Sequence, residues 1–279
     1  MPPATMNMLL ERGGNEALDV NPNFGTTIHL VTDGSNWYWT VFSIMSVTAL
    51  AYVVAAYFVP RKERFFHYTS IAATLFSAVA YFSLASNLGW TGVQTEFSHY
   101  QDGGIRQVFY ARYIGWFLTS PLLIINMAFL AGLSWPTVLF MAGMQEIYVV
   151  GGLIGALVPS SYKWGYFTFA VAAFLLVLYN LAYVAVQSIQ TLHSATAYEK
   201  LTAYFRVVVG SVGLIYLLYA ISWALSEGAN AISPTSEGVF YGVLDIMALP
   251  LLNSAVLYLT RRVDFAELGV TIPEGVTKA

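Results

Sequence analysis

The chain has 279 residues, of which 57% are hydrophobic and 10% are charged, whereas about a quarter of the residues in a soluble domain are charged. This composition predicts an integral membrane protein. The net charge of −3, with no basic stripe outside the ends of the apolar segments, argues against nucleic-acid binding, and the absence of cysteine excludes disulfides and thiolate metal sites.

Charged residues and prolines divide the sequence into apolar segments long enough to cross a bilayer as helices, which takes about 20 residues each. The seven predicted spans are 37–59, 65–88, 108–133, 136–158, 164–187, 201–225 and 239–260. The predicted fold class is therefore an all-α membrane protein, a bundle of seven transmembrane helices. Residues 1–36 would form an N-terminal tail, 37–260 the transmembrane domain and 261–279 a C-terminal tail.

The connections between the spans indicate the orientation of the bundle. Residues 1–25 contain no basic region followed by an apolar core, so a cleavable signal peptide is not expected. The basic residues of PRKER after the first span, Lys200, Arg206 and RR after the seventh span predict cytoplasmic ends, with the N-terminus outside and the C-terminus inside. The longest connection, 89–107, contains YQDGGIRQ and is expected to form a β-hairpin with a two-residue turn.

A charge inside a span is costly and must face protein or water. Arg206 in the sixth predicted span is expected to extend to the cytoplasmic interface, and three other charged residues stand out. Arg112 is near the outer end of the third span, Glu146 is midway along the fourth, and Asp245 is on the seventh. Arg112 and Asp245 are expected to pair, directly or through water, as a structural lock between helices, with a transport or ligand role as the alternative. Glu146 is expected to be a neutral acid that hydrogen-bonds within the bundle, or a proton relay.

The third span, ARYIGWFLTSPLLIINMAFLAGL at 111–133, resembles the third helix of the microbial rhodopsins. GGLIGAL in the fourth span, YLLYAISW running into SEG in the sixth and LDIMA in the seventh match the family in the same order. KWGYF and DIMALP are most similar to the fungal branch, the opsin-related proteins. The resemblance covers nearly the whole core and implies an opsin-like bundle.

The resemblance also implies roles for single positions. Asp245 matches the carboxylate that helps to balance a retinal Schiff base, and Arg112 matches the arginine beside it. The lysine that forms the Schiff base stands four residues after that carboxylate, where this chain has Leu249. Leucine has no amine, so no covalent retinal and no bound cofactor are expected. Gly115 replaces the proton acceptor of the pumps and Asn126 replaces the proton donor, so light-driven pumping is not expected.

Other matches concern the pocket and the outer surface. Family pocket positions correspond to Trp116, Ser120, Tyr219, Trp223 and Tyr216, the last in place of a tryptophan. Such an aromatic stripe is also typical of core packing, and Leu249 would fill part of any cavity. Glu227 and Glu237 match outer carboxylates that share a releasable proton in the pumps, and here they are expected to decorate an acidic loop.

The function implied by the fungal resemblance is that of a stress-induced plasma-membrane protein, acting as a membrane chaperone or as a regulator of a plasma-membrane proton ATPase. Expected partners are membrane lipids and such an ATPase, with a homo-oligomer left open. The alternative is a sensor or channel that binds retinal or a similar ligand non-covalently in the residual pocket. An engineered replacement at Leu249 in a true rhodopsin would leave Gly115 and Asn126 to be explained separately. No enzymatic motif or histidine cluster for a metal is apparent.

Overall fold

The computed structural model describes residues 15–192 and 195–261. Seven of the helices in these ranges are long and apolar enough to cross a membrane, which confirms the predicted seven-helix bundle. The first four spans are α3 (Thr32–Tyr57), α4 (Phe65–Ala85), α5 (Tyr110–Leu130) and α6 (Trp135–Leu157). The fifth is α7 (Lys163–Tyr179) continued by η3 (Asn180–Ala185) and α8 (Val186–Leu192). The last two are α9 (Ala195–Trp223) with η4 (Ala224–Gly228), and α10 (Pro234–Ile246) with η5 (Met247–Leu252) and α11 (Asn253–Thr260).

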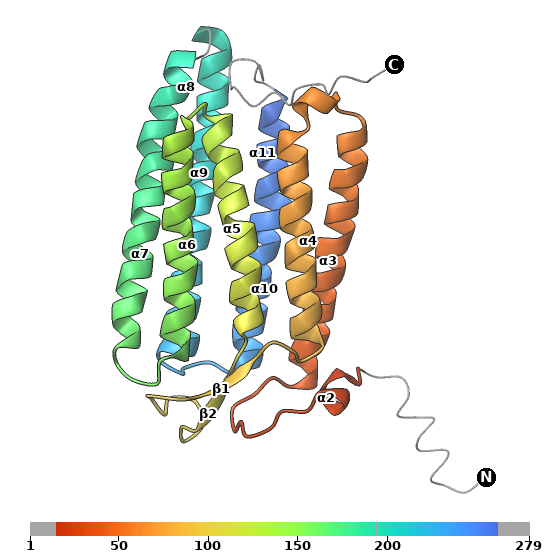
Figure 1. Cartoon of the computed structure of the whole chain (residues 1–279), viewed down its shortest axis with the longest axis vertical. Helices are drawn as coiled ribbons and strands as arrows, with labels where there is room; N and C mark the ends of the chain where they lie inside the picture. The colour runs from red at the N-terminus through yellow and green to blue at the C-terminus, as the bar shows by residue number, and fades with distance from the viewer. Residues whose placement is uncertain (1–14, 193–194, 262–279) are drawn as a thin grey trace, which may run out of the picture.

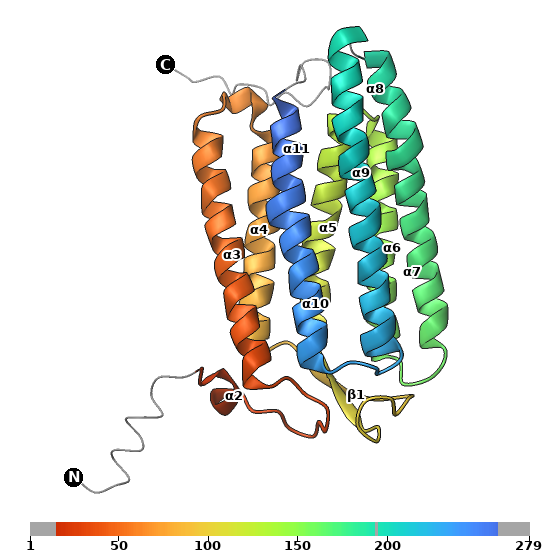
Figure 2. The same cartoon turned by 180° about the vertical axis from the view of Figure 1, so that it is seen from behind.

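The spans run side by side, and short elements close their ends (Figure 1). β1 (Thr91–Gln94), β2 (Ile105–Val108) and α2 (Ala17–Val20) lie at one end of the bundle, which we call the hairpin end. A 3₁₀ turn, η2 (Arg61–Glu63), connects α3 to α4 at the opposite end. Viewed from behind, the last span lies beside α3, so the bundle closes on itself (Figure 2).

The predicted hairpin is present, but its turn is not the two-residue turn expected from Asp-Gly-Gly. β1 and β2 pair antiparallel, with Gln94 opposite Ile105 and residues 95–104 forming the connection. This longer loop is held from outside, because the Asn230 amide donates to the carbonyls of Phe97 and Tyr100, both at 3.1 Å. A tertiary contact with the α9–α10 connection therefore overrides the local turn preference.

The last span is irregular where it passes the middle of the bundle. η5 is a π-helical segment that contains Pro250, which has no N–H to continue the helical hydrogen bonds. The Tyr52 hydroxyl on α3 lies 3.0 Å from the carbonyl oxygen of Leu249 and 3.1 Å from that of Pro250. A neighbouring helix thus satisfies backbone acceptors that the irregular segment leaves open. π-Bulges are frequent at functional sites, and this one contains Leu249.

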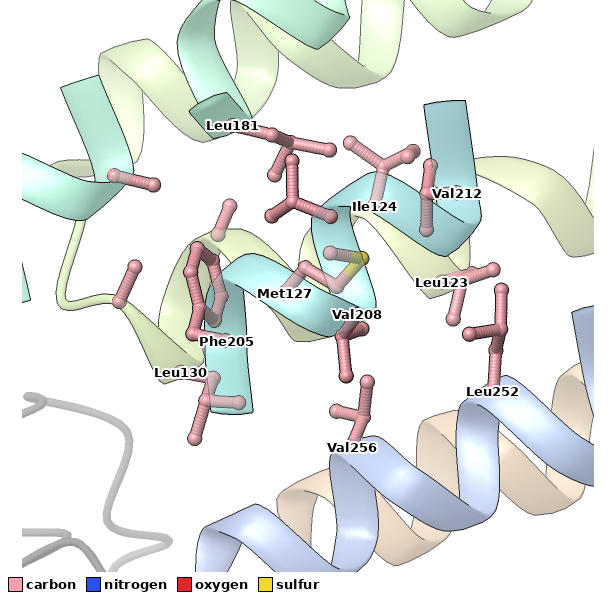
Figure 3. Close-up of a cluster of buried hydrophobic side chains, with 14 of the residues drawn as sticks. Leu123, Ile124, Met127, Leu130, Leu181, Phe205, Val208, Val212, Leu252 and Val256 are labelled. Carbon is pink, nitrogen blue, oxygen red and sulfur yellow. The ribbon is translucent and has the colours of Figure 1, made fainter. Parts of the chain in front are cut away.

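The half of the bundle away from the hairpin contains a large apolar cluster. Side chains from α5, α9 and the last span meet there with Leu181 of η3 (Figure 3). The labelled members include Leu123, Met127, Phe205, Val212 and Val256. Polar and charged side chains are concentrated nearer the hairpin end, where the candidate site lies.

Candidate functional site

Asp245 lies at the junction of four helices. Its Oδ1 atom accepts hydrogen bonds from the Trp116 indole N–H, at 2.9 Å, and from the Tyr219 hydroxyl. Its Oδ2 atom accepts one from the Tyr81 hydroxyl. The donors come from α5, α9 and α4, while Asp245 itself is on α10 and is 4% exposed. A buried carboxylate at this position therefore draws the helices together through aromatic donors.

Arg112 forms no direct ion pair with Asp245 in the described part of the chain, so the direct form of that expectation is wrong, and the water-bridged form stays a prediction. One Arg112 guanidinium nitrogen, Nη1, donates to Glu237, and the other, Nη2, donates to the Tyr38 hydroxyl at 2.7 Å. The Arg112 guanidinium also lies 4.6 Å from the centre of the Tyr241 ring. A helical side chain leaves its backbone toward the helix N-terminus. The long Arg112 side chain therefore reaches toward the hairpin end and meets Glu237, two helical turns before Asp245.

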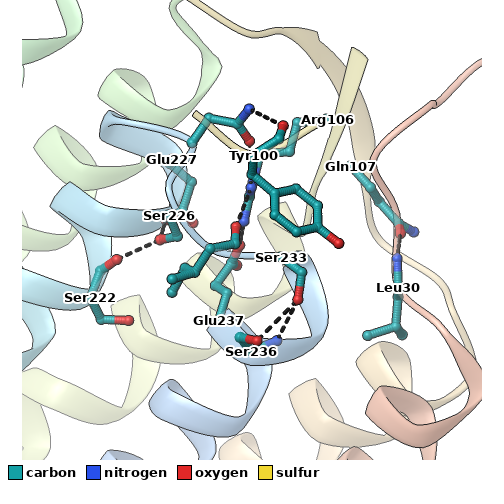
Figure 4. A network of polar contacts seen from close by, with 12 residues as sticks. Leu30, Tyr100, Arg106, Gln107, Ser222, Ser226, Glu227, Ser233, Ser236 and Glu237 are labelled. Carbon is teal, nitrogen blue, oxygen red and sulfur yellow. Dashed lines mark hydrogen bonds and ion pairs between the residues drawn. The ribbon is translucent and has the colours of Figure 1, made fainter. Parts of the chain in front are cut away.

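Glu227 and Glu237 are buried rather than on an acidic loop, which corrects the second expectation about charges. They are 5% and 1% exposed. Glu237 also forms an ion pair with Arg106 of β2, at 2.7 Å, and Glu227 Oε1 lies 3.7 Å from Arg112. Figure 4 shows this part of the hairpin end, where the side chain of Arg106 on β2 connects the hairpin to Glu237. We call Arg106, Arg112, Glu227 and Glu237 the charged quartet.

The quartet is held in place by short polar contacts. The Glu227 carboxylate accepts from the Tyr113 hydroxyl at 2.9 Å and from Ser226. Arg106 donates to the side-chain oxygen of Asn230 at 2.8 Å and to the carbonyl of Ile232 at 2.7 Å. Two arginines face two glutamates, so the quartet has no formal net charge and its buried ions are hydrogen-bonded, as buried ions must be.

The structure places all six predicted pocket residues around one cavity. Trp116, Ser120, Tyr216, Tyr219, Trp223 and Leu249 line it together with Asp245. Aromatic rings form much of the wall: the centre of the Trp116 ring is 5.3 Å from that of Tyr219 and 4.8 Å from that of Tyr241. The cavity has a volume of about 50 Å³. It is thus a small chamber beside Asp245, surrounded by aromatic side chains.

Gln145 on α6 also lines the cavity, and the sequence analysis did not single it out. Its side chain is fully buried, and neither its Nε2 nor its Oε1 atom has a hydrogen-bond partner within the described residues. Buried amides are almost always hydrogen-bonded. The unsatisfied amide therefore marks this wall as a place where a polar group would be stabilised.

Gly115 and Asn126, the positions where the resemblance predicts that pump residues are replaced, have structural roles. A Cβ atom on Gly115 would come within 2.6 Å of the Ala80 Cβ, so this glycine lets α5 approach α4 closely. An acidic side chain could not be placed there without moving α4. Asn126 is fully buried and accepts from the Thr69 hydroxyl at 2.6 Å, and its amide lies 3.4 Å from the side-chain oxygen of Asn253. It connects helices in the half of the bundle away from the hairpin.

Glu146 was expected to hydrogen-bond within the bundle, and the structure contradicts this. The residue is partly exposed on α6, and its Oε2 atom has no hydrogen-bond partner among the described residues. Its neighbours Gly143, Ile147 and Val150 on the same helix are exposed. Glu146 therefore lies at the edge of the outward face of α6 instead of in the bundle interior.

Arg106, Tyr38 and Tyr81 belong to the site but lie outside the motifs that indicate the family. Arg106 is in the connection predicted to form the hairpin, and a tyrosine in an apolar span gives no signal of its own. The available signal was indirect. Two acidic residues at the hairpin end needed cations if they were buried, and Arg106 was one of the few basic residues on that side.

Comparison with known proteins gives the family. A model of bacteriorhodopsin-like proteins matches residues 33–249. The opsin-like protein carO of Fusarium fujikuroi is 42% identical, over 92% of this chain and 85% of carO. The 30 kDa heat shock protein of Saccharomyces cerevisiae is 34% identical, over 87% of this chain and 76% of that protein.

Solved structures agree with these matches. The light-driven proton pump rhodopsin of Coccomyxa subellipsoidea has a TM-score of 0.76 and 30% sequence identity, covering 83% of this chain and 98% of that chain. The resemblance inferred from the third, fourth, sixth and seventh spans is thereby confirmed. The chain belongs to the bacteriorhodopsin-like family of microbial rhodopsins, and within it the chain is similar to fungal opsin-related proteins.

Proposed function

We propose that this chain is a non-pumping opsin-related protein that acts on other membrane proteins, as a stress-associated membrane chaperone or as a regulator of a plasma-membrane proton ATPase. The observation that carries the non-pumping part is Leu249, which lines the cavity beside Asp245 where the resemblance places the Schiff-base lysine. A leucine side chain cannot form an imine. The protein is accordingly proposed to be neither a light-driven pump nor an enzyme.

Retinal does not fit the cavity as it stands. Pockets for ligands of that size enclose about 300 Å³ or more, whereas this cavity has about 50 Å³. The stacked rings of Phe174 and Tyr216, with centres 5.1 Å apart, and the edge-to-face pair of Trp116 and Tyr241 occupy the surrounding space. Both the attachment chemistry and the volume therefore argue against a bound chromophore.

A membrane partner is supported by Glu146. An ionised side chain that faces lipid near the middle of a span costs about 2.5–3.5 kcal/mol, and an acid that takes up a proton costs less. Such residues almost always face protein or water. Its Oε2 atom is buried without a hydrogen-bond partner in the described part of the chain, while the rest of the side chain is partly exposed on α6. A helix of another protein, packed beside Gly143 and Ile147, would cover this exposed part of the Glu146 side chain. Among the relatives, the heat shock protein supports a role in stress by its name.

Affinity capture from a fungal membrane after brief cross-linking tests this proposal. The tagged chain should recover the plasma-membrane proton ATPase, and Glu146→Leu should reduce the recovery several-fold because it removes the polar contact. Ile147→Leu, on the same exposed face, is the matched control and should recover as much ATPase as the unchanged chain. No enrichment of the ATPase with the unchanged chain, or equal recovery with Glu146→Leu, would reject this assignment.

The second candidate is a sensor or channel that uses the residual cavity. The observation in its favour is the unsatisfied, fully buried Gln145 amide in the cavity wall. A saturable increase in melting temperature with all-trans retinal would support the retinal-like ligand, and the absence of any increase would remove that ligand class.

A further inference from the structure

The charge of the cavity wall differs from that of the charged quartet. Asp245 is the one acidic side chain among the residues that line the cavity, and no lysine, arginine or histidine is among them. The nearest arginine of the quartet, Arg112, is already bonded to Glu237 and Tyr38. Because the quartet contains two positive and two negative groups, it offers no spare positive charge to Asp245. An ionised Asp245 would therefore have three neutral donors and no directly bonded cation among the described residues.

The hydrogen bonds of Asp245 fit an ionised acid with one site left. A carboxylate offers about four lone-pair sites. Oδ1 accepts from Trp116 and Tyr219, and Oδ2 accepts only from Tyr81. The Trp116 indole N–H can only donate, and both tyrosine hydroxyls are able to donate, so an ionised Asp245 satisfies all three contacts. One acceptor site on Oδ2 therefore remains for a further N–H donor.

The cavity wall suits a cation as well. Cations are attracted to the faces of tryptophan and tyrosine rings, most strongly where water is excluded. Trp116, Tyr219, Trp223 and Tyr241 all line the cavity, and Tyr241 already accepts the Arg112 guanidinium over its ring. The unpartnered Gln145 side chain adds a carbonyl oxygen that can accept a second N–H. A positive group would find a carboxylate, an amide oxygen and aromatic faces around one space.

The volume limits the ligand. One water molecule needs roughly 10–15 Å³ of such space, and the cavity has about 50 Å³. It therefore has room for a molecule of only a few non-hydrogen atoms. We propose that the cavity binds a small primary ammonium ion, with its N–H groups toward Asp245 and its alkyl end toward Leu249. The ligand class differs from retinal, and the site is separate from the α6 face proposed for a membrane partner.

Thermal unfolding of the purified full chain in detergent tests the proposal, with methylammonium chloride as the probe. Sodium chloride at the same ionic strength and pH is the reference. At a hundredfold excess over its dissociation constant, methylammonium should raise the melting temperature saturably, by about 5–10 °C relative to sodium. An equal response to both salts, or no response, would overturn the proposal and would favour a protonated Asp245 that needs no cation.

Two variants keep the test specific. Asp245→Asn should abolish the response to methylammonium. Leu249→Lys supplies a tethered amine to the same space, so it should raise the melting temperature without added amine and lose the methylammonium response. Leu249→Met, which has a long side chain without an amine, should give no such rise. If Leu249→Lys keeps the full response, the amine site is not beside Asp245 and the proposal fails.

Glu146→Leu separates this inference from the proposed partner function. It should retain the full methylammonium response, because Glu146 is not among the residues that line the cavity. Loss of ATPase capture with an intact methylammonium response would leave the amine site standing on its own. Loss of the methylammonium response in Glu146→Leu would contradict the placement of the site.

Discussion

The charged quartet and the Asp245 cavity are both buried polar regions on the same helices, but they solve the problem of a buried charge differently. In the quartet each carboxylate lies within ion-pair distance of an arginine. At Asp245 three neutral donors surround a carboxylate that has no basic neighbour among the residues lining its cavity. The quartet is thus compensated by charges of its own, whereas the carboxylate of Asp245 is held by neutral donors alone.

The largest effect is expected in the quartet. Glu237→Gln should lower the free energy of unfolding by about 3–5 kcal/mol, because it leaves two buried arginines without their shared carboxylate. Denaturant unfolding in mixed micelles measures the change. Asp19→Asn, at an exposed position outside the spans, is the control and should be neutral. A loss below about 1 kcal/mol would show that the arginines have other partners.

A smaller loss is expected for Asp245→Asn, about 1–3 kcal/mol, because the amide nitrogen of asparagine would face donors that formerly bonded to a carboxylate oxygen. The same unfolding assay compares it directly with Glu237→Gln. A loss as large as that of Glu237→Gln would mean that Asp245 is ion-paired in solution. That result would mean that the two regions do not differ in how they stabilise a buried carboxylate.

The interaction energy between the charged quartet and Asp245 should be smaller than either of these losses in the free energy of unfolding. Arg112→Gln and Asp245→Asn should show an interaction energy below about 1 kcal/mol, since the two side chains share Trp116 as a neighbour but make no direct contact. A cycle with Arg112→Gln and Glu237→Gln is the matched comparison and should show a clear interaction energy. A coupling above about 1 kcal/mol between Arg112 and Asp245 would restore the direct pair that the sequence suggested.

The smallest effect belongs to the outward face of α6. Glu146→Leu should change the stability of the isolated protein by no more than about 0.5 kcal/mol, as surface substitutions usually do. Circular dichroism during heating in detergent is sufficient to measure this. Because Glu146 is expected to act only with a partner, a large loss of stability in the isolated chain would place it inside the bundle after all.

The sequence was informative about the fold because span length and apolarity are local properties. Each of the seven predicted spans corresponds to a helical span of the structure, and the motifs of the third, fourth, sixth and seventh spans together indicated the family. The hairpin was also predictable from its glycines. Its turn was not, because the loop conformation depends on Asn230, more than a hundred residues away.

The partners of the charged residues were harder to predict. The Arg112–Asp245 pair was inferred because Arg112 was the basic residue within the spans that could face Asp245, with Glu237 assigned to the surface. The direction in which a long helical side chain extends decided the actual pairing. The position of Gln145 was equally hard to predict. The local sequence QEIY does not indicate that the glutamine faces a cavity while the neighbouring glutamate faces outward.

The absorption spectrum of the purified protein with all-trans retinal tests the central claim most directly, that this opsin fold works without a covalently bound chromophore. We expect the spectrum of free retinal alone, and no covalent adduct after treatment with borohydride, because Leu249 offers no amine. A red-shifted band that borohydride converts into a stable adduct would contradict the account.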